Sequence, residues 1–249
     1  MNGRKFAVFA ALAASCAIAA SAEPLPANIA AAAKDPARAE QAKVDATRHG
    51  PEILAFAGVQ PGAKVVDLIP GGGYWTGLFS ASVGSGGHVY AVWPAEYVKV
   101  DGDEVKPYRE VAAKYANVSI LEQPAAQLTT PEKVDLVFTA QNYHDYPDKF
   151  MGPTDPAVLN KAVFAALKPG GTYLIVDHVA QAGSSLRDTD TLHRIDPATV
   201  KSQVTAAGFQ FVGESPLLAN PADDHTKKVF DPSVQGHTDQ FIYKFRKPG

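Results

Sequence analysis

The sequence predicts an α/β fold in which helices cover both faces of a mostly parallel sheet. Three observations carry this prediction: apolar runs suited to strands alternate with helical patterns, there are seven such runs, and a glycine-rich loop follows the first. Strands that alternate with helices form mostly parallel sheets with right-handed crossovers. The chain has 249 residues, of which 46% are hydrophobic, so it is long enough for one domain with a substantial core.

The expected elements follow in order along the chain. The strands are residues 64–69, 88–93, 118–121, 134–140, 172–178, 209–214 and 240–245. The helices are residues 76–83, 104–115, 156–167 and 196–208. Asp155 and Asp196 each precede a proline, which is typical of an N-cap followed by a first-turn residue. Residues 181–194 and 220–238 are expected to be long loops, where substrate contacts are common.

The N-terminus predicts an exported protein. Arg4 and Lys5 precede an apolar run at 6–20, and small residues lead to Ala22. This pattern indicates a signal peptide at 1–22, cleaved near Ala22, and hence a periplasmic protein. Residues 23–58 are then expected to form a peripheral helical extension, and residues 59–249 the main domain.

A lipoprotein anchored at Cys16 is the less favoured alternative. Ala13 stands three positions before Cys16, where a lipoprotein signal has a large aliphatic residue. No later segment is apolar enough to form a stable membrane span after cleavage. The net charge is −3 with no basic block, so no nucleic-acid partner is expected. A small-molecule substrate is the expected partner, and the sequence does not give the oligomeric state.

The most informative segment is the loop after the first expected strand, where residues 65–76 read VVDLIPGGGYWT. Glycine allows a tight turn and lets a ligand approach the main chain. The free N–H groups at the start of the next helix favour an anion. A tight turn without a ligand is the alternative. The dinucleotide-binding fingerprint fits less well, because Gly77 lies one position too late for the third glycine.

This segment resembles the first motif of class I S-adenosylmethionine-dependent methyltransferases. Asp67 matches the acidic residue of that motif, Gly71 and Gly73 match its second and third glycines, and Ile69 occupies the position of the first. Further segments resemble the family in the right order: 60–64 (QPGAK), 134–138 (VDLVF) and 167–174 (LKPGGTYL). The resemblance covers residues 48–249. Residues 187–196 and 245–248 are similar to a little-characterised bacterial group of predicted exported methyltransferases.

The resemblance implies a Rossmann-like fold, a mostly parallel seven-stranded sheet with an antiparallel last strand, and S-adenosyl-L-methionine as cofactor. The family usually holds the ribose hydroxyls with an acid at the end of the second strand, whereas here that strand ends at Trp93 and the nearest acid is Glu96. The third-strand acid is also missing, and Glu122 or Gln123 stands nearby. The expected cofactor-binding residues are Asp67, Pro70, Gly71, Gly72, Gly73, Tyr74, Trp93, Glu96, Gln123 and Asn142.

The segment after the fourth expected strand carries the candidate catalytic residues. In the family this position lies beside the transferable methyl group. We expect His144 to act as a general base, Asp145 to orient it and Tyr143 to shape the acceptor pocket. A hydrogen-bonded loop that caps the sheet is the alternative.

A second polar group contains Asp177, His178, Arg187, Asp188, Asp190, His193 and Arg194. Its spacing does not match a metal motif, so no metal site is predicted, and we expect ion pairs along a lid or an anionic-substrate pocket around Arg187 and Arg194. The other histidines, His49, His88, His225 and His237, are expected at surface or capping positions.

Three functions are compatible with these patterns. A methyltransferase acting on a small molecule agrees best with the order of the motifs. The alternative is an exported binding protein that keeps the fold without the chemistry, which the missing ribose acid favours. A dinucleotide-dependent oxidoreductase has the poorest glycine spacing, and the fold alone does not decide among the three.

Overall fold

The structure is a computed structural model that describes residues 24–249. The predicted signal peptide at 1–22 and Cys16 lie outside the described residues. The strands are β1 (Lys64–Leu68), β2 (His88–Pro94), β3 (Val118–Gln123), β4 (Val134–Ala140), β5 (Leu167–His178), β6 (Gln210–Ser215) and β7 (Gln240–Arg246). The α-helices are α1 (Ala27–Ala33), α2 (Asp45–Arg48), α3 (Gly50–Ala57), α4 (Tyr74–Val83), α5 (Ala95–Ala112), α6 (Pro156–Ala166), α7 (Thr189–Leu192) and α8 (Pro197–Ala206). The 3₁₀-helices are η1 (Pro36–Arg38), η2 (Gln41–Val44), η3 (Tyr143–Asp145) and η4 (Lys149–Met151).

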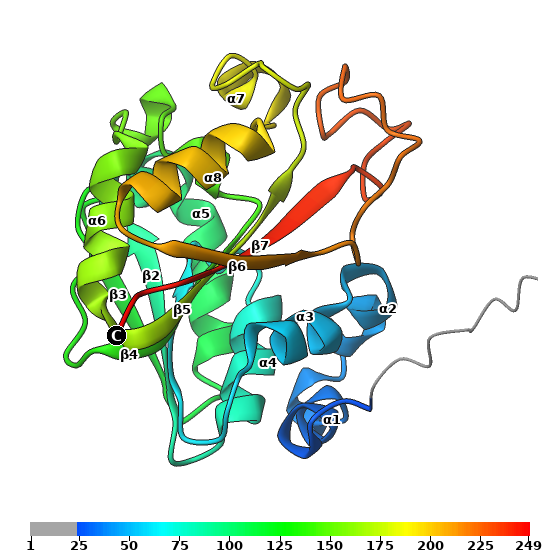
Figure 1. The fold of residues 1–249 in the computed structure, drawn as a ribbon. Helices are drawn as coiled ribbons and strands as arrows, with labels where there is room; N and C mark the ends of the chain where they lie inside the picture. The colour runs from blue at the N-terminus through cyan, green and yellow to red at the C-terminus, as the bar shows by residue number, and fades with distance from the viewer. Residues whose placement is uncertain (1–23) are drawn as a thin grey trace, which may run out of the picture.

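All seven strands form one sheet in the order β3-β2-β1-β4-β5-β7-β6 (Figure 1). The first five strands run parallel to one another, and β7 is antiparallel to both β5 and β6. The predicted fold class is therefore confirmed, including the antiparallel last strand. The order reverses direction between β1 and β4, which places the switch point of the sheet at the end of β1. Ligands of open α/β sheets bind at this point, outside the carboxyl ends of the strands.

Both faces of the sheet are covered by helices. Helices α6 and α8 lie on one side, and α1, α3 and α4 lie on the other (Figure 1). The prolines at the first turns of α6 and α8 follow capping aspartates, as predicted. The Asp155 carboxylate accepts the Ala157 N–H at 2.8 Å, and the Asp196 carboxylate accepts the Ala198 N–H at 2.9 Å.

The N-terminal extension is part of the core, so the expectation that it is peripheral is wrong. Ile29 of α1 and Ile53 of α3 are fully buried and join the cluster that contains Phe79 and Phe138. The Asn28 side chain donates to the carbonyls of Val59 and Ser82. The Ala-rich sequence of α1 concealed this role, because Ile29 is the one large apolar residue in that helix.

Helix α5 begins earlier than predicted, at Ala95 instead of residue 104. Asp101 has non-helical dihedrals (φ −132°, ψ 45°), so the segment is two helical stretches joined at a kink. Asp and Gly are poor helix formers, and residues 101–103 read DGD. The sequence therefore predicted only the second stretch.

The two predicted long loops lie together above the carboxyl end of β5 and the amino end of β7, which is antiparallel to it. Residues 220–238 contain no helix or strand, and the segment 181–194 contains only the single turn of α7. Buried Arg194 forms an ion pair of 2.9 Å with buried Asp223 and so joins the two loops. Within residues 24–249, none of the helices combines the length and the apolar character needed to cross a membrane.

Candidate functional site

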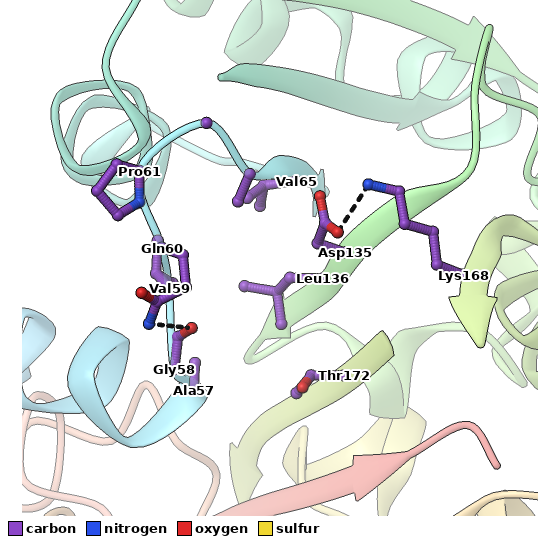
Figure 2. A pocket seen from close by; sticks show the side chains of 12 residues that line it. Ala57, Gly58, Val59, Gln60, Pro61, Val65, Asp135, Leu136, Lys168 and Thr172 are labelled. Carbon is purple, nitrogen blue, oxygen red and sulfur yellow. Dashed lines mark hydrogen bonds and ion pairs between the residues drawn. The ribbon is translucent and has the colours of Figure 1, made fainter. Parts of the chain in front are cut away.

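Cavities lie at both edges of the sheet, and only one edge suits a ligand of this fold. A cavity of about 270 Å³ lies at the amino ends of β1 and β4, beside Asp135 and Lys168 (Figure 2). Lys168 there forms a 2.7 Å ion pair with Asp135, whose other carboxylate oxygen accepts the Lys64 N–H. This cavity faces away from the switch point, so it is not the candidate site.

Two adjoining cavities open at the carboxyl edge. We name one the tryptophan cavity, of about 330 Å³, after Trp75 in its wall. We name the other the histidine cavity, of about 360 Å³, after His144, His178 and His193. The two share Gln141, His178, Val229 and Phe230 as lining residues.

The glycine loop has the backbone conformation that the sequence predicts. Gly71 and Gly73 have positive φ angles of 52° and 80°. Ile69, in the position of the family's first glycine, also has a positive φ of 51°. A β-branched residue rarely adopts this conformation, so the loop holds strain at Ile69. Gly72 is open, since a Cβ placed on it would meet nothing within 4 Å.

The loop leads into an uncapped helix. Gly73 is the N-cap of α4 and supplies no side-chain hydrogen bond to its first turn. The Gly73 N–H bonds to the Pro70 carbonyl at 2.9 Å, which closes the turn. Uncapped N–H groups at a helix start attract anions. The main chain of Gly71 and Gly72, next to this helix start, is thus placed to hold an anionic group, whereas Pro70 has no N–H to donate and instead closes the turn.

Asp67 is buried beneath this loop and is 1% exposed. Thr76 donates its hydroxyl to the carboxylate at 2.6 Å, and the Thr76 oxygen lies 3.1 Å from the Tyr108 hydroxyl. Burial raises the pKa of Asp67 to about 7, and the bond from Thr76 only partly opposes this rise. Asp67 therefore fixes the loop from inside through Thr76.

Neither aromatic residue after the loop fills the space over Gly72. Tyr74 points toward the N-terminal helices, where its hydroxyl donates to Asp45 at 2.7 Å. Trp75 packs on Phe138 with ring centroids 4.7 Å apart. Tyr74, predicted to bind cofactor, instead anchors the extension to α4.

Ten buried side-chain polar atoms lack a hydrogen-bond partner within residues 24–249, and three of them lie at the ends of neighbouring strands. They are Nε1 of Trp93 at the end of β2, Nε2 of Gln123 at the end of β3, and Oδ1 of Asn142 just after β4. Buried polar atoms are normally hydrogen-bonded, so unpartnered ones at a ligand edge indicate where a ligand bonds. All three residues are among the predicted cofactor-binding residues.

Glu96, expected to replace the missing ribose acid, lies in the first turn of α5. Its carboxylate accepts the Ala125 N–H at 2.8 Å, so it also positions the chain after β3. Trp93 is fully buried and packs edge-on against Tyr108, with centroids 5.4 Å apart. The surroundings of Trp93 at the end of β2 are therefore aromatic and buried, with the Glu96 carboxylate nearby in the chain.

His144 occupies the centre of a dense hydrogen-bonded group. Its Nδ1 lies 2.7 Å from Asp177, and its Nε2 lies 3.1 Å from Asp145 and 3.4 Å from Nδ1 of His193. Burial alone would lower the pKa of His144, but Asp177 and Asp145 outweigh it and raise the pKa well above its usual range. A raised pKa favours the protonated imidazole, which cannot accept a proton, so it disfavours the expected role of His144 as a general base.

Asp177, at the carboxyl end of β5, is the residue that orients His144. Its carboxylate also accepts the main-chain N–H of His144 at 2.9 Å and of His178 at 2.8 Å. Asp145, to which we assigned the orienting role, contacts the opposite nitrogen. Burial, the largest single effect, raises the pKa of Asp145, but the combined effects of His144 and then His193 outweigh it and lower the pKa to about 2.

We expected Tyr143 to shape the acceptor pocket, but its side chain does not line the histidine cavity. Its side chain is fully buried, and its hydroxyl donates to Gln203 at 3.0 Å and accepts from Asn160 at 2.8 Å. It therefore fixes the loop after β4 to α6 and α8. The adjacent His144 points the other way, into the histidine cavity.

The expected ion pairs in the 181–194 segment are present, whereas the anionic pocket is not formed. Arg194 is fully buried and bonds to Asp223 and to the carbonyls of Val179 and Lys227. Arg187 pairs with its neighbour Asp188 at 2.7 Å. Of the isolated histidines, His225 pairs with Asp239 and His88 with Ser119.

Comparisons with solved structures address the fold. An S-adenosylmethionine-dependent methyltransferase from Aquifex aeolicus superposes with a TM-score of 0.58 at 18% identity, over 85% of this chain and 93% of that one. The glycopeptide N-methyltransferase MtfA, complexed with sinefungin, gives 0.56 at 16% identity, over 82% and 87%. The [4+2]-cyclase SpnF gives 0.59 at 16% identity, over 81% and 80%.

No family model and no curated protein sequence matches the chain. The similarity to solved structures is below 20% identity, so it concerns architecture and not activity. The strand order, the antiparallel β7 and these superpositions agree with one another. The chain has the Rossmann-like fold of the S-adenosylmethionine-dependent methyltransferases.

Proposed function

We propose that the protein is an S-adenosyl-L-methionine-dependent methyltransferase that acts on a small molecule bound in the histidine cavity. The observation that carries the proposal is the set of three unpartnered polar atoms on Trp93, Gln123 and Asn142, which end strands on the same side of the sheet as the glycine loop that follows β1. The fold, shared with methyltransferases solved with this cofactor or with sinefungin, supports the choice of ligand.

The residues at the carboxyl edge fit the parts of this cofactor. The uncapped start of α4 and the main chain of Gly71 and Gly72 suit its carboxylate. Trp93 and Gln123 offer N–H donors toward the nucleoside, and Asn142 offers a carbonyl oxygen. When bound, the cofactor supplies an activated methyl group and its own leaving group.

The chain's main contribution is alignment of the acceptor. Asn142 lines the histidine cavity and is also one of the residues proposed to bond the cofactor, so the acceptor is assigned to this cavity. Holding two reactants in line contributes about 7–11 kcal/mol to a transfer reaction. Tyr97, Phe150 and Phe230 give the cavity an aromatic wall, which suits an acceptor with an apolar body and one polar group near His144.

Calorimetric titration tests the proposal. We expect micromolar binding of S-adenosylmethionine and S-adenosylhomocysteine and no binding of NAD. A Trp93→Phe/Gln123→Ala double variant removes both unpartnered donors and should weaken binding of both ligands. Tight NAD binding, or equal affinity in the double variant, would refute the cofactor assignment.

An exported binding protein without catalytic activity is the second candidate. Glu96 favours it, because its carboxylate is engaged with Ala125 and the strand offers no other acid for the ribose. Absence of binding by all three titrants would support this candidate. Export itself is proposed from residues 1–22 and is tested by N-terminal sequencing of the periplasmic protein, which should begin near Glu23.

A further inference from the structure

Three potential metal ligands converge on one point in the wall of the histidine cavity. They are Nε2 of His144, a carboxylate oxygen of Asp145 and Nδ1 of His193. The first two residues come from η3, after β4, and His193 comes from the end of α7. Because two segments almost fifty residues apart supply the ligands, motif spacing did not predict this site.

The separations between these atoms match a bound cation. His144 Nε2 lies 3.1 Å from Asp145 Oδ1 and 3.4 Å from His193 Nδ1, and the third separation is 3.7 Å. Zn²⁺ binds nitrogen and oxygen at about 2.0–2.2 Å, so three ligands of a tetrahedral site lie about 3.4 Å from one another. A cation about 2 Å from all three atoms is therefore compatible with these separations.

The surroundings of His144 are also those of a metal ligand. Asp177 lies 2.7 Å from Nδ1 and is itself held by two main-chain N–H groups. This carboxylate favours a proton on Nδ1 and directs the lone pair of Nε2 toward Asp145 and His193. A histidine oriented by a carboxylate is the usual arrangement at protein metal sites.

The fourth side of the site faces open space. The His193 side chain is 23% exposed, whereas those of His144 and Asp145 are 3% and 10% exposed. All three line the histidine cavity. Three protein ligands with an open fourth position are typical of a catalytic zinc site, in contrast to the four closed ligands of a structural one.

We propose that His144, Asp145 and His193 bind a Zn²⁺-like transition-metal ion, with its fourth position open to the histidine cavity. Two nitrogens and one carboxylate favour Zn²⁺ or Co²⁺ over Mg²⁺, which prefers oxygen ligands. The open position would take water or a polar atom of the acceptor. The proposal does not depend on the methyltransferase assignment, because it concerns only these side chains.

The test uses protein that carries no polyhistidine tag and has been freed of metal with a chelator. Titration with Co²⁺ should give one equivalent of binding and the strong visible bands of a tetrahedral site. Zn²⁺ should displace Co²⁺, and Mg²⁺ should not. Because the readout is metal binding, calorimetry with S-adenosylhomocysteine on the same metal-free protein separates failure of this proposal from failure of the proposed function.

Variants assign the ligands. His193→Asn retains a residue that tolerates the positive φ of 53° at this position, and Asp145→Asn keeps the shape of the side chain. Both should abolish the tetrahedral spectrum, and Asp177→Asn should weaken binding by roughly 10–100-fold. His237→Ala, an exposed histidine outside the site, is the matched control and should bind as the wild type does. Absence of binding by the wild type, or a spectrum that survives both ligand variants, would overturn the proposal.

Discussion

Replacement by alanine should stabilise the protein at Gly72 and destabilise it at the adjacent Gly73. A Cβ on Gly72 meets nothing within 4 Å, and Gly72 has no positive φ, so Gly72→Ala is compatible with the fold. Such a change raises stability by about 0.4–1 kcal/mol, because it restricts the unfolded chain. A Cβ on Gly73 lies 2.8 Å from Val111 Cγ1, and Gly73 has a φ of 80°.

The cost of Gly73→Ala follows from these two features. The left-handed backbone costs roughly 1–2 kcal/mol for a residue with a Cβ, and the contact with Val111 adds to this cost. We expect a loss of about 2–3 kcal/mol, which corresponds to a decrease in melting temperature of about 4–12 °C for a chain of this length.

Ligand affinity should separate the two variants further. If the cofactor lies against Gly72, the new methyl group displaces it and removes one or two hydrogen bonds of about 1 kcal/mol each. Gly72→Ala should then weaken S-adenosylhomocysteine by about 5–30-fold while the melting temperature is maintained or raised. Calorimetry and differential scanning fluorimetry on both variants measure these quantities. Unchanged affinity in Gly72→Ala would refute the proposed approach of the ligand to this residue.

Three further predictions concern stability. Because the pKa of buried Asp67 is raised, the free energy of unfolding should fall by on the order of 4 kcal/mol as the pH rises from about 4 to about 7. In urea unfolding experiments, the free energy of unfolding of Asp67→Asn should fall less over this pH range, and parallel pH curves for the two proteins would contradict this. Asp223→Ala leaves the buried charge of Arg194 unpaired and should cost about 3–5 kcal/mol in the same assay, so a loss below 1 kcal/mol would contradict the burial of this pair. Tyr74→Phe removes the bond to Asp45 and should cost about 1 kcal/mol without changing the affinity for S-adenosylhomocysteine; a weakened affinity would return Tyr74 to the cofactor site.

The sequence predicted the architecture because the strands and helices have strong local signals. The alternation of apolar runs, the proline after Asp155 and after Asp196, and the glycines of the loop each reflect local backbone preferences. These features were confirmed by the sheet order, the caps and the positive φ angles.

The site was only partly predictable, because its key contacts join distant segments. Asp177 orients His144 across 33 residues, and His193 reaches the same point from α7. The sequence placed His144 correctly after β4 but could not indicate which carboxylate would contact which ring nitrogen. The orientation of the Tyr74 side chain likewise could not be predicted from the neighbouring sequence, because it depends on a hydrogen bond to Asp45 in the N-terminal extension.

The bonds from Asn28 to Val59 and Ser82 have a consequence for how the chain folds. Ser82 lies in α4, so α1 cannot complete these contacts until α4 has been synthesised. For the export that we propose from the sequence of residues 1–22, a chain must stay unfolded until it has been translocated, and this late pairing of α1 agrees with that requirement. We therefore expect removal of residues 24–48 to leave a protein that exposes the apolar side of α4 and aggregates during refolding.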